Sequence, residues 1–421
     1  THWSPTGKWG VLSFELETYG VRLLNSDDRV GTEPVWYGIP NRQDFSAPII
    51  LRGLREIGAQ KEGVVLWVQH EHGIWPDDHK FVAMLKELPI PKVVTFHTIH
   101  FQSQETSTGL RRRQYNLLQD LLPHVEAITV FSRGAYRAVA EAFPEYRDKV
   151  HILKHGIHNY PEIRTLTRRE AKEKLNDYLI YESDLDLETK EALNRERIFL
   201  DPNVVVVGQT GFLSYGKNSE LLYNIRDNLQ VLIPDKRVIV VRIGSARDES
   251  QQIYAQQLKK MCNQQDKFLL EIWPEQSILP LAQRAFDVNF YWPRDCTQSG
   301  ILAHALGAGA IIAGRDLEGV GETLKEAGEP ADTDLNNLLS KIQTLILNSE
   351  VGEQIQDKAL EYAEEHSWER QAQRHYELAE KILTPTPVLS VAHSLVDNDT
   401  MNILAASKKE ANVPAEIISA A

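Results

Sequence analysis

The sequence predicts an α/β protein built from two doubly wound domains, and three observations support this prediction. Two series of short apolar segments alternate with helical patterns, at spacings long enough for crossovers between parallel strands. The second series starts with four consecutive valines at 204–207, a run that is apolar on both faces, as a strand inside a parallel sheet requires. A length of 421 residues also exceeds what a single hydrophobic core usually supports.

The first series predicts an N-terminal domain over residues 1–160. Its expected strands are 34–39, 63–69, 92–96, 127–131 and 150–153, and its expected helices are 46–57, 111–122 and 134–142. Residues 1–10 have the pattern of a loop and 11–24 that of a helix, with no apolar strand before them. We therefore expect the first strand of this domain to be missing at the N-terminus.

A charged helical linker or insertion is expected at 161–202, and the second domain follows over 203–366. Further strands are predicted at 237–243, 267–272, 288–292 and 310–313, with helices at 249–263, 277–285, 299–306, 336–349 and 352–365. Ser367 has the pattern of an N-cap for a final helix over 367–383. Residues 384–421 are expected to form a disordered tail, a short helix at 401–409 being the alternative.

Composition limits the classes of function. Hydrophobic residues at 42% and charged residues at 25% are typical of soluble globular proteins, and no apolar run approaches the roughly 20 residues of a transmembrane helix. A net charge of −13 disfavours a broad nucleic-acid surface, because such binding depends on neutralising phosphates. Cys262 and Cys296 provide no disulfide framework, which favours a cytoplasmic location. Peripheral contact with the inner face of the membrane is the alternative.

Two turns of the second domain are suited to bind an anion. The loop 208–218 follows the valine strand and contains three glycines and one cation, Lys217. Small residues from Ser299 start a helix after the strand 288–292, and backbone N–H groups at a helix start favour negative charge. Both turns lie at the carboxyl edge of one sheet, where open α/β sheets hold ligands. An ordinary βα turn with a solvated lysine is the alternative for the loop taken alone.

Histidines follow two neighbouring strands of the first domain. His70, Glu71 and His72 end one strand, and His97 and His100 follow the next. Three interpretations compete: scattered surface or capping histidines, a metal site from two histidines and Glu71, and a sugar-binding edge. We favour the last, because the spacing matches no known metal signature and imidazoles with a carboxylate hydrogen-bond hydroxyl groups.

Several motifs together resemble the retaining glycosyltransferases of GT-B fold, specifically the family 4 group, over nearly all of residues 1–383. Gly211-Phe-Leu-Ser-Tyr-Gly-Lys217-Asn is similar to the family's Gly-Arg-Leu-x-x-x-Lys-Gly loop. The run 93–98, Val-Val-Thr-Phe-His-Thr, is similar to the strand whose histidine faces the donor sugar. Further landmarks are Thr6–Gly10, Gln69–Ile74, His155–Gly156 and Ser367–Arg370, the last of which opens a helix that crosses back to the first domain.

Two departures from the family pattern are visible. Phe212 stands where the family usually has a phosphate-binding arginine, which leaves Lys217 as the cation of that loop. The family's paired glutamates, eight positions apart, fall on Cys296 and His304. The second glutamate usually holds the donor ribose, and His304 retains hydrogen-bonding capacity. These two departures leave open which nucleotide-sugar donor the chain binds and, to a lesser degree, whether it is catalytically active.

The resemblance implies a nucleotide-sugar donor in the second domain, a glycan, lipid-linked or small-molecule acceptor in the first, and an active site in the cleft between them. No metal or other cofactor is expected, and the departing phosphate takes the acceptor proton. His97 and Lys217 are the expected catalytic residues. The sugar and acceptor side is assigned to His70, Glu71, His72 and His100. The donor phosphates and nucleotide are assigned to Gly10, Gly211, Phe212, Lys217, Trp273, Gln298, Ser299, Gly300, Ile301 and His304.

Three other functions stay open at this point. A nucleotide-sugar epimerase and a sugar phosphorylase share the fold, and a non-catalytic sugar- or nucleotide-binding protein is consistent with the absent glutamates. An epimerase consumes no acceptor, a phosphorylase needs free phosphate, and a binding protein holds a donor without turnover.

Overall fold

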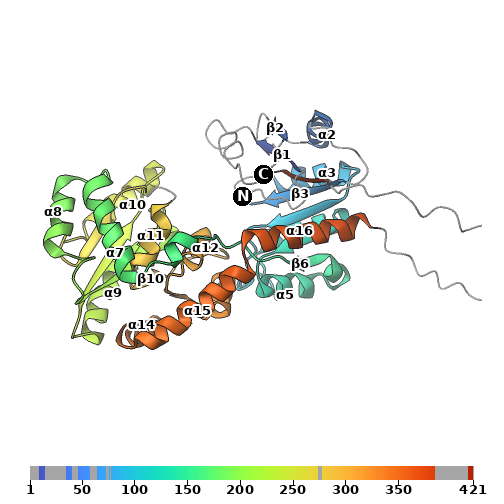
Figure 1. Cartoon of the computed structure of the whole chain (residues 1–421). Helices are drawn as coiled ribbons and strands as arrows, with labels where there is room; N and C mark the ends of the chain where they lie inside the picture. The colour runs from blue at the N-terminus through green and yellow to red at the C-terminus, as the bar shows by residue number, and fades with distance from the viewer. Residues whose placement is uncertain are drawn as a thin grey trace, which may run out of the picture.

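The protein forms two lobes, each built around a parallel β-sheet (Figure 1). This computed structural model describes residues 9–14, 35–39, 46–56, 64–72, 75, 77–273, 277–384 and 416–420. The prediction of two doubly wound α/β domains is confirmed.

Within the described ranges, the first sheet has seven parallel strands. Their order is β2 (Val35–Ile39), β1 (Trp9–Phe14), β13 (Glu416–Ala420), β3 (Val64–His70), β4 (Lys92–Phe96), β5 (Ala127–Val130) and β6 (Val150–Ile152). One face packs against the helices α3 (Asp78–Glu87), α4 (Arg112–Leu121) and α5 (Arg133–Ala142), and α2 (Ala47–Glu56) also contributes to that core. The other face packs against α16 (Trp368–Leu383), as predicted for a helix that returns to the first domain.

Both ends of the chain differ from the sequence prediction. Residues 11–14 were expected to be helical, but they belong to strand β1, so the expectation that the first strand is missing is wrong. The apolar pair Ile417 and Ile418 lies in β13, which is inserted between β1 and β3, so this part of the tail is ordered. In both cases pairing with neighbouring strands decides the conformation, and the local pattern does not contain this information. Residues 15–24 and the alternative helix at 401–409 lie outside the described residues.

In the described part of the chain, the second sheet has six strands, all parallel, and the order in which the chain adds them reverses once. Its order is β12 (Ala331–Asp332), β11 (Ile312–Arg315), β10 (Val288–Tyr291), β7 (Val204–Thr210), β8 (Arg237–Ile243) and β9 (Lys267–Leu270). The chain enters at β7, proceeds to β8 and β9, and then continues on the other side at β10. A topological switch point therefore lies between β7 and β10, and ligands of open α/β sheets bind at such a point.

Helices cover both faces of the second sheet. One face packs against α9 (Ser219–Leu232), α10 (Glu249–Lys259) and α14 (Leu335–Leu347). The other packs against α7 (Arg168–Asp177), α8 (Leu187–Glu196) and α11 (Ile278–Ala285). Beside them lie α12 (Gly300–Gly307), α13 (Glu318–Glu326) and α15 (Ser349–Glu365). The segment 161–202, expected as a charged helical linker or insertion, helps to build the second domain, because Ala171, Leu175 and Leu179 cover its sheet.

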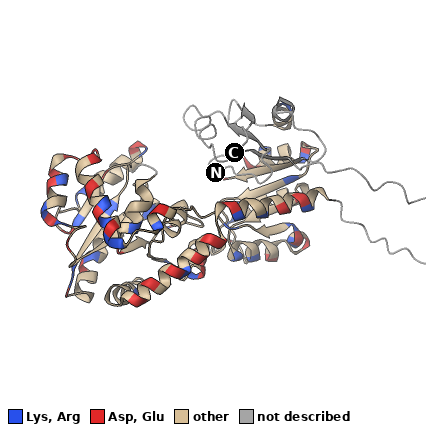
Figure 2. Ribbon diagram, in the orientation of Figure 1, with Lys and Arg blue, Asp and Glu red and all other residues tan. Residues whose placement is uncertain are grey.

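The described surface carries both signs of charge. Lys and Arg alternate with Asp and Glu along the helices of both lobes (Figure 2). No helix in the described part of the chain is both long and apolar enough to cross a membrane.

Candidate active site between the two domains

The loop after β7 is held in place by a buried arginine. Gly211 has a φ of 115°, in the region that favours glycine. Arg242 is completely buried near the end of β8, and its guanidinium donates hydrogen bonds to the carbonyl oxygens of Gln209, Gly211 and Phe212 at 3.2, 2.9 and 2.8 Å. Burial lowers the pKa of Arg242 to about 10, so it stays charged at neutral pH. The sequence interpretation missed Arg242, although a charge inside the apolar run 238–243 is a detectable signal.

Lys217 lies at the switch point of the second sheet. Its Nζ donates a hydrogen bond to the Tyr291 hydroxyl at 3.2 Å, and that hydroxyl donates to Ser299 Oγ at 2.8 Å. Burial lowers the pKa of Lys217, and no carboxylate within the described ranges forms an ion pair with it. A partly desolvated cation without an acidic partner is well suited to bind an anion. The contacts bring together the loop after β7, the end of β10 and the start of α12.

The start of α12 is open. A Cβ added at Gly300 would meet no atom within 4 Å, and one added at Gly211 would lie 3.2 Å from the Ile301 side chain. The glycine loop and the helix start are therefore neighbours, as the sequence predicted. The first N–H groups of a helix have no partner within the helix, so those near Ser299 and Gly300 are suited to meet an anion.

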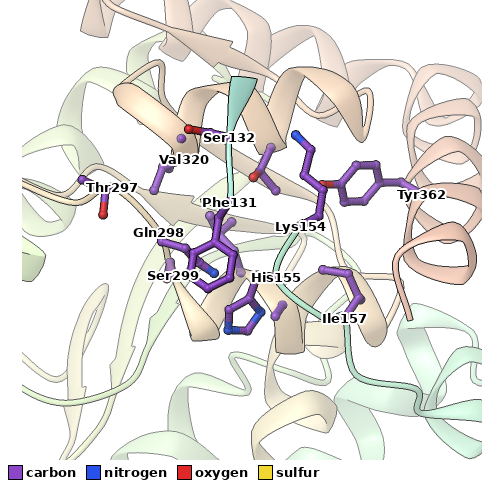
Figure 3. Close-up of a pocket in the computed structure, with 14 residues that line it drawn as sticks. Phe131, Ser132, Lys154, His155, Ile157, Thr297, Gln298, Ser299, Val320 and Tyr362 are labelled. Carbon is purple, nitrogen blue, oxygen red and sulfur yellow. The ribbon is translucent and has the colours of Figure 1, made fainter. Parts of the chain in front are cut away.

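A cavity beside this helix start is lined by both domains (Figure 3). The second domain contributes Thr297, Gln298 and Ser299. The first domain contributes Phe131, Ser132, Lys154 and His155, from the ends of β5 and β6. Gln298 therefore lines this cavity, and its Oε1 is buried without a hydrogen-bond partner among the described residues. Its assignment to the donor stays a prediction.

His304 contacts the segment that connects the two domains. Its ring stacks on His158 at a centroid distance of 3.9 Å and an interplanar angle of 8°. Its Nδ1 is hydrogen-bonded to the Tyr160 hydroxyl. Burial lowers the pKa of His304 to about 4, so the ring is neutral at physiological pH. One ring face and one nitrogen are therefore already occupied, which leaves less capacity for a ribose than the resemblance implied.

Three side chains form a stack beyond the carboxyl ends of strands of the second sheet. Phe212 stacks on Trp273 at 4.4 Å and 14°, and the Arg247 guanidinium lies 3.0 Å from the centre of the Phe212 ring. Trp273 is 56% exposed. Phe212, Trp273 and Arg247 follow β7, β9 and β8, respectively. Phe212 and Trp273 were both assigned to the donor phosphates and nucleotide, and the sequence interpretation missed the arginine beside them.

His97 is oriented by contacts on both sides. Its Nε2 lies 2.8 Å from Gln69 Oε1, and its ring packs edge-on against Phe131 at 5.3 Å. Phe131 also contacts His155, and both of these residues line the cavity. Burial lowers the pKa of His97, while the charge of Glu71 opposes this effect. A neutral imidazole is therefore held next to the cavity.

Glu71 forms hydrogen bonds to two residues of its own domain. Its carboxylate accepts hydrogen bonds from the Thr98 hydroxyl at 2.7 Å and from the His72 backbone N–H at 2.8 Å. It thereby connects the ends of β3 and β4, the two strands whose polar ends were predicted to meet.

His70 does not lie at the edge of a sugar site. Its side chain is only 1% exposed and packs between Phe81 and Phe96. Burial is the main cause that lowers the pKa of His70 to about 3. The assignment of His70 to sugar hydroxyls is corrected, because alternation along β3 turns its side chain to the same face as the core residues Leu66 and Val68.

His100 binds the other domain. Its Nδ1 lies 2.8 Å from Glu318 Oε2, and Glu318 Oε1 accepts hydrogen bonds from the backbone N–H groups of Phe101 and Gln102. Glu318 has a φ of 45°, which is strained for a residue with a side chain. His100 is therefore buried in an interdomain contact, which corrects its assignment to the acceptor.

A second carboxylate of α13 also crosses between the domains. Glu322 accepts hydrogen bonds from the backbone N–H groups of Arg133 and Gly134 and from Lys154 Nζ. The sequence interpretation predicted no helix here. Glycines at 319 and 321 weaken the helical pattern, and nothing local indicates that its acids bind another domain.

Gly10 lies inside β1, where it pairs with Val35 and Ile418. It was expected in a loop beside the donor phosphates. This expectation is wrong, because the residues around it extend the first sheet.

Known structures share this architecture, although the sequence matches no protein-family model and no curated protein. A UDP-forming α,α-trehalose-phosphate synthase from Burkholderia xenovorans is 13% identical, with a TM-score of 0.62 over 90% of this chain and 100% of that one. The corresponding synthase from Burkholderia vietnamiensis is 12% identical, with a TM-score of 0.62 over 90% and 98%. A glycosyltransferase from Rickettsia africae is 12% identical, with a TM-score of 0.59 over 90% and 100%.

The chain therefore has the GT-B fold. At this level of identity the comparison establishes the architecture, and the family 4 assignment stays a prediction.

Proposed function

We propose that this chain is a retaining glycosyltransferase that transfers a sugar from a nucleotide-sugar donor to an acceptor held by the first domain. The proposal rests on the hydrogen bond from Lys217 to Tyr291 and the hydrogen bond from Tyr291 to Ser299 at the switch point, beside a cavity that both domains line. The two Burkholderia synthases of the same fold are named UDP-forming, which supports a UDP-sugar as the donor. Acceptor classes are a glycan, a lipid-linked sugar and a small molecule such as a sugar phosphate.

The proposed mechanism is electrostatic. The bond between the anomeric carbon and the phosphate oxygen breaks, the acceptor oxygen bonds to the same face of that carbon, and the departing phosphate takes the acceptor proton. Negative charge grows on the diphosphate during this step. Lys217 and the N–H groups near Ser299 and Gly300 stabilise this charge more strongly in the transition state than in the bound donor.

A screen of donors tests the proposal. Thermal unfolding is measured with UDP-, GDP- and ADP-sugars, and a ligand at 100 times its Kd is expected to stabilise the protein by about 2.7 kcal/mol. The stabilising donor is then incubated with and without acceptors, and the products are analysed. A donor product formed without acceptor would indicate an epimerase, a requirement for phosphate would indicate a phosphorylase, and binding without turnover would indicate a binding protein.

Transfer is expected to persist in excess EDTA, because a lysine and a helix start take the role that a metal ion has in other transferases. Initial rates at 25 °C with and without the chelator check this expectation. If EDTA abolished transfer and Mg²⁺ or Mn²⁺ restored it, the electrostatic role of Lys217 would be contradicted. The group of His70, Glu71, His72 and His97 would then be reinterpreted as a catalytic metal site.

A further inference from the structure

A cluster of metal-ligand groups lies at the end of β3, and the proposed transfer does not use it. One ligand atom from each of His70, His72 and Asp78 lies within 4.8 Å of the other two. The imidazole rings are perpendicular, with centroids 5.2 Å apart. Sequence analysis considered Glu71 as the carboxylate of such a site, but Glu71 binds Thr98.

Two nitrogens of this cluster have no hydrogen-bond partner in the part of the chain that the structure describes. His70 Nε2 and His72 Nδ1 are buried, and neither forms a hydrogen bond to any described residue. The His70 side chain is only 1% exposed, so bulk solvent does not supply the missing hydrogen bond. A buried polar atom without a partner costs free energy, and most such atoms in native proteins have one. The two nitrogens therefore indicate a ligand.

We propose that His70, His72 and Asp78 bind one divalent transition-metal ion, for which Zn²⁺ is the test ion. Imidazole nitrogens and a carboxylate oxygen are ordinary zinc ligands, and three protein ligands leave a fourth position for water. Tetrahedral ligands at about 2.1 Å from zinc are about 3.4 Å apart, so binding requires a small contraction of the cluster.

Arg113 competes with a metal ion for the carboxylate of Asp78, and it therefore provides a test of the proposed site. Its guanidinium donates two hydrogen bonds to Asp78, at 2.7 and 2.9 Å. A carboxylate has about four acceptor positions, so the arginine leaves two for an ion. The positive charge of the guanidinium repels a metal cation, whereas its hydrogen bonds orient the Asp78 carboxylate.

The ion would join the end of β3 to the start of α3. The carbonyl oxygen of His70 accepts a hydrogen bond from the His97 backbone N–H at 3.0 Å, so the site supports the strand end beside His97. Its role is structural, and it is separate from the charge stabilisation proposed at Lys217. Metal binding is measured without donor or acceptor, so this proposal and the proposed function can fail independently.

The test uses the full chain after treatment with a chelator and its removal. Calorimetric titration with Zn²⁺ is expected to give one ion per chain and a higher unfolding temperature. Co²⁺ is expected to give the visible absorption of a tetrahedral site. His72→Gln and Asp78→Asn should each weaken binding at least about 10-fold, whereas His79→Gln, at the exposed neighbouring histidine, should not change it.

Arg113→Gln separates ligation from folding. It removes the same ion pair as Asp78→Asn but keeps all three ligands, so zinc binding should be retained or become tighter. Absence of binding to the wild-type chain would overturn the proposal. Equal losses in Arg113→Gln and Asp78→Asn would also overturn it. So would binding that survives His72→Gln but is lost in Asp295→Asn, which lies in the other His and carboxylate cluster of the described residues.

Discussion

Replacing Lys217 with alanine is expected to lower kcat by about 10²-fold or more. The expected loss follows from the removal of one group that stabilises charge in the transition state. Lys217 is the only Lys or Arg of the loop 211–218, since Phe212 stands where the resembling family has an arginine. Steady-state kinetics with the donor found in the thermal screen would measure the effect.

Control variants distinguish charge from packing. Lys217→Met keeps most of the side-chain volume and should lose as much activity as the alanine variant. Lys217→Arg should recover part of it, and Lys260→Ala, at an exposed lysine of the same domain, should leave kcat unchanged. Wild-type turnover in Lys217→Ala would contradict the assignment of the diphosphate to this loop.

The loss of kcat expected for Lys217→Ala depends on the contribution of a second cation, Arg247. Its guanidinium lies on the Phe212 ring, at the position from which the resembling family presents its own arginine, and it comes from the loop after β8. If Arg247 compensated fully for the missing arginine, Lys217→Ala would lose less than 10²-fold, and Arg247→Ala would lose a comparable amount. Measuring both single variants and the double variant would apportion the charge between the two loops.

The central strands of both sheets could be predicted because they are buried on both faces. The predicted strands 92–96 and 237–243 coincide with β4 and β8. A continuous run of β-branched and apolar residues indicates such a strand without knowledge of its neighbours. Strands β1 and β13 are neighbours inside the first sheet, and they depend on each other for pairing across more than 400 positions of sequence. The local sequence pattern therefore predicted a helix for residues of β1 and disorder for residues of β13.

The site was predictable where it follows from topology. Carboxyl ends of neighbouring parallel strands meet at one edge, so the sequence alone predicts that Lys217 and Ser299 lie close together. Alternation along β3 was also available in the sequence, and it would have placed His70 on the same face as Leu66 and Val68. The contact of His100 with Glu318 could not be predicted, because it joins residues 218 positions apart across two domains.

Replacing His97 with alanine is the second large effect that we expect. His97 lies at the carboxyl end of a strand of the first domain and packs against Phe131, which lines the cavity. The proposed phosphate site lies on the second domain, so His97 is expected to meet the hydroxyls of the donor sugar. Loss of a hydrogen bond to a buried hydroxyl costs roughly 1–3 kcal/mol, which corresponds to a fall in kcat/KM of up to about 10²-fold.

Two measurements decide between a contact with the sugar and a structural role for His97. Calorimetry with the free nucleoside diphosphate should give an affinity within a few fold of wild type for His97→Ala, because the diphosphate lacks the sugar. Kinetics with the complete donor should show the full loss. Gln69→Ala removes the side chain that holds the imidazole nitrogen at 2.8 Å, so it should give a smaller loss of the same kind. If His97→Ala lost as much affinity for the free diphosphate as it lost kcat/KM with the complete donor, the effect would not depend on the sugar. His97 would then support the nucleotide site or the fold.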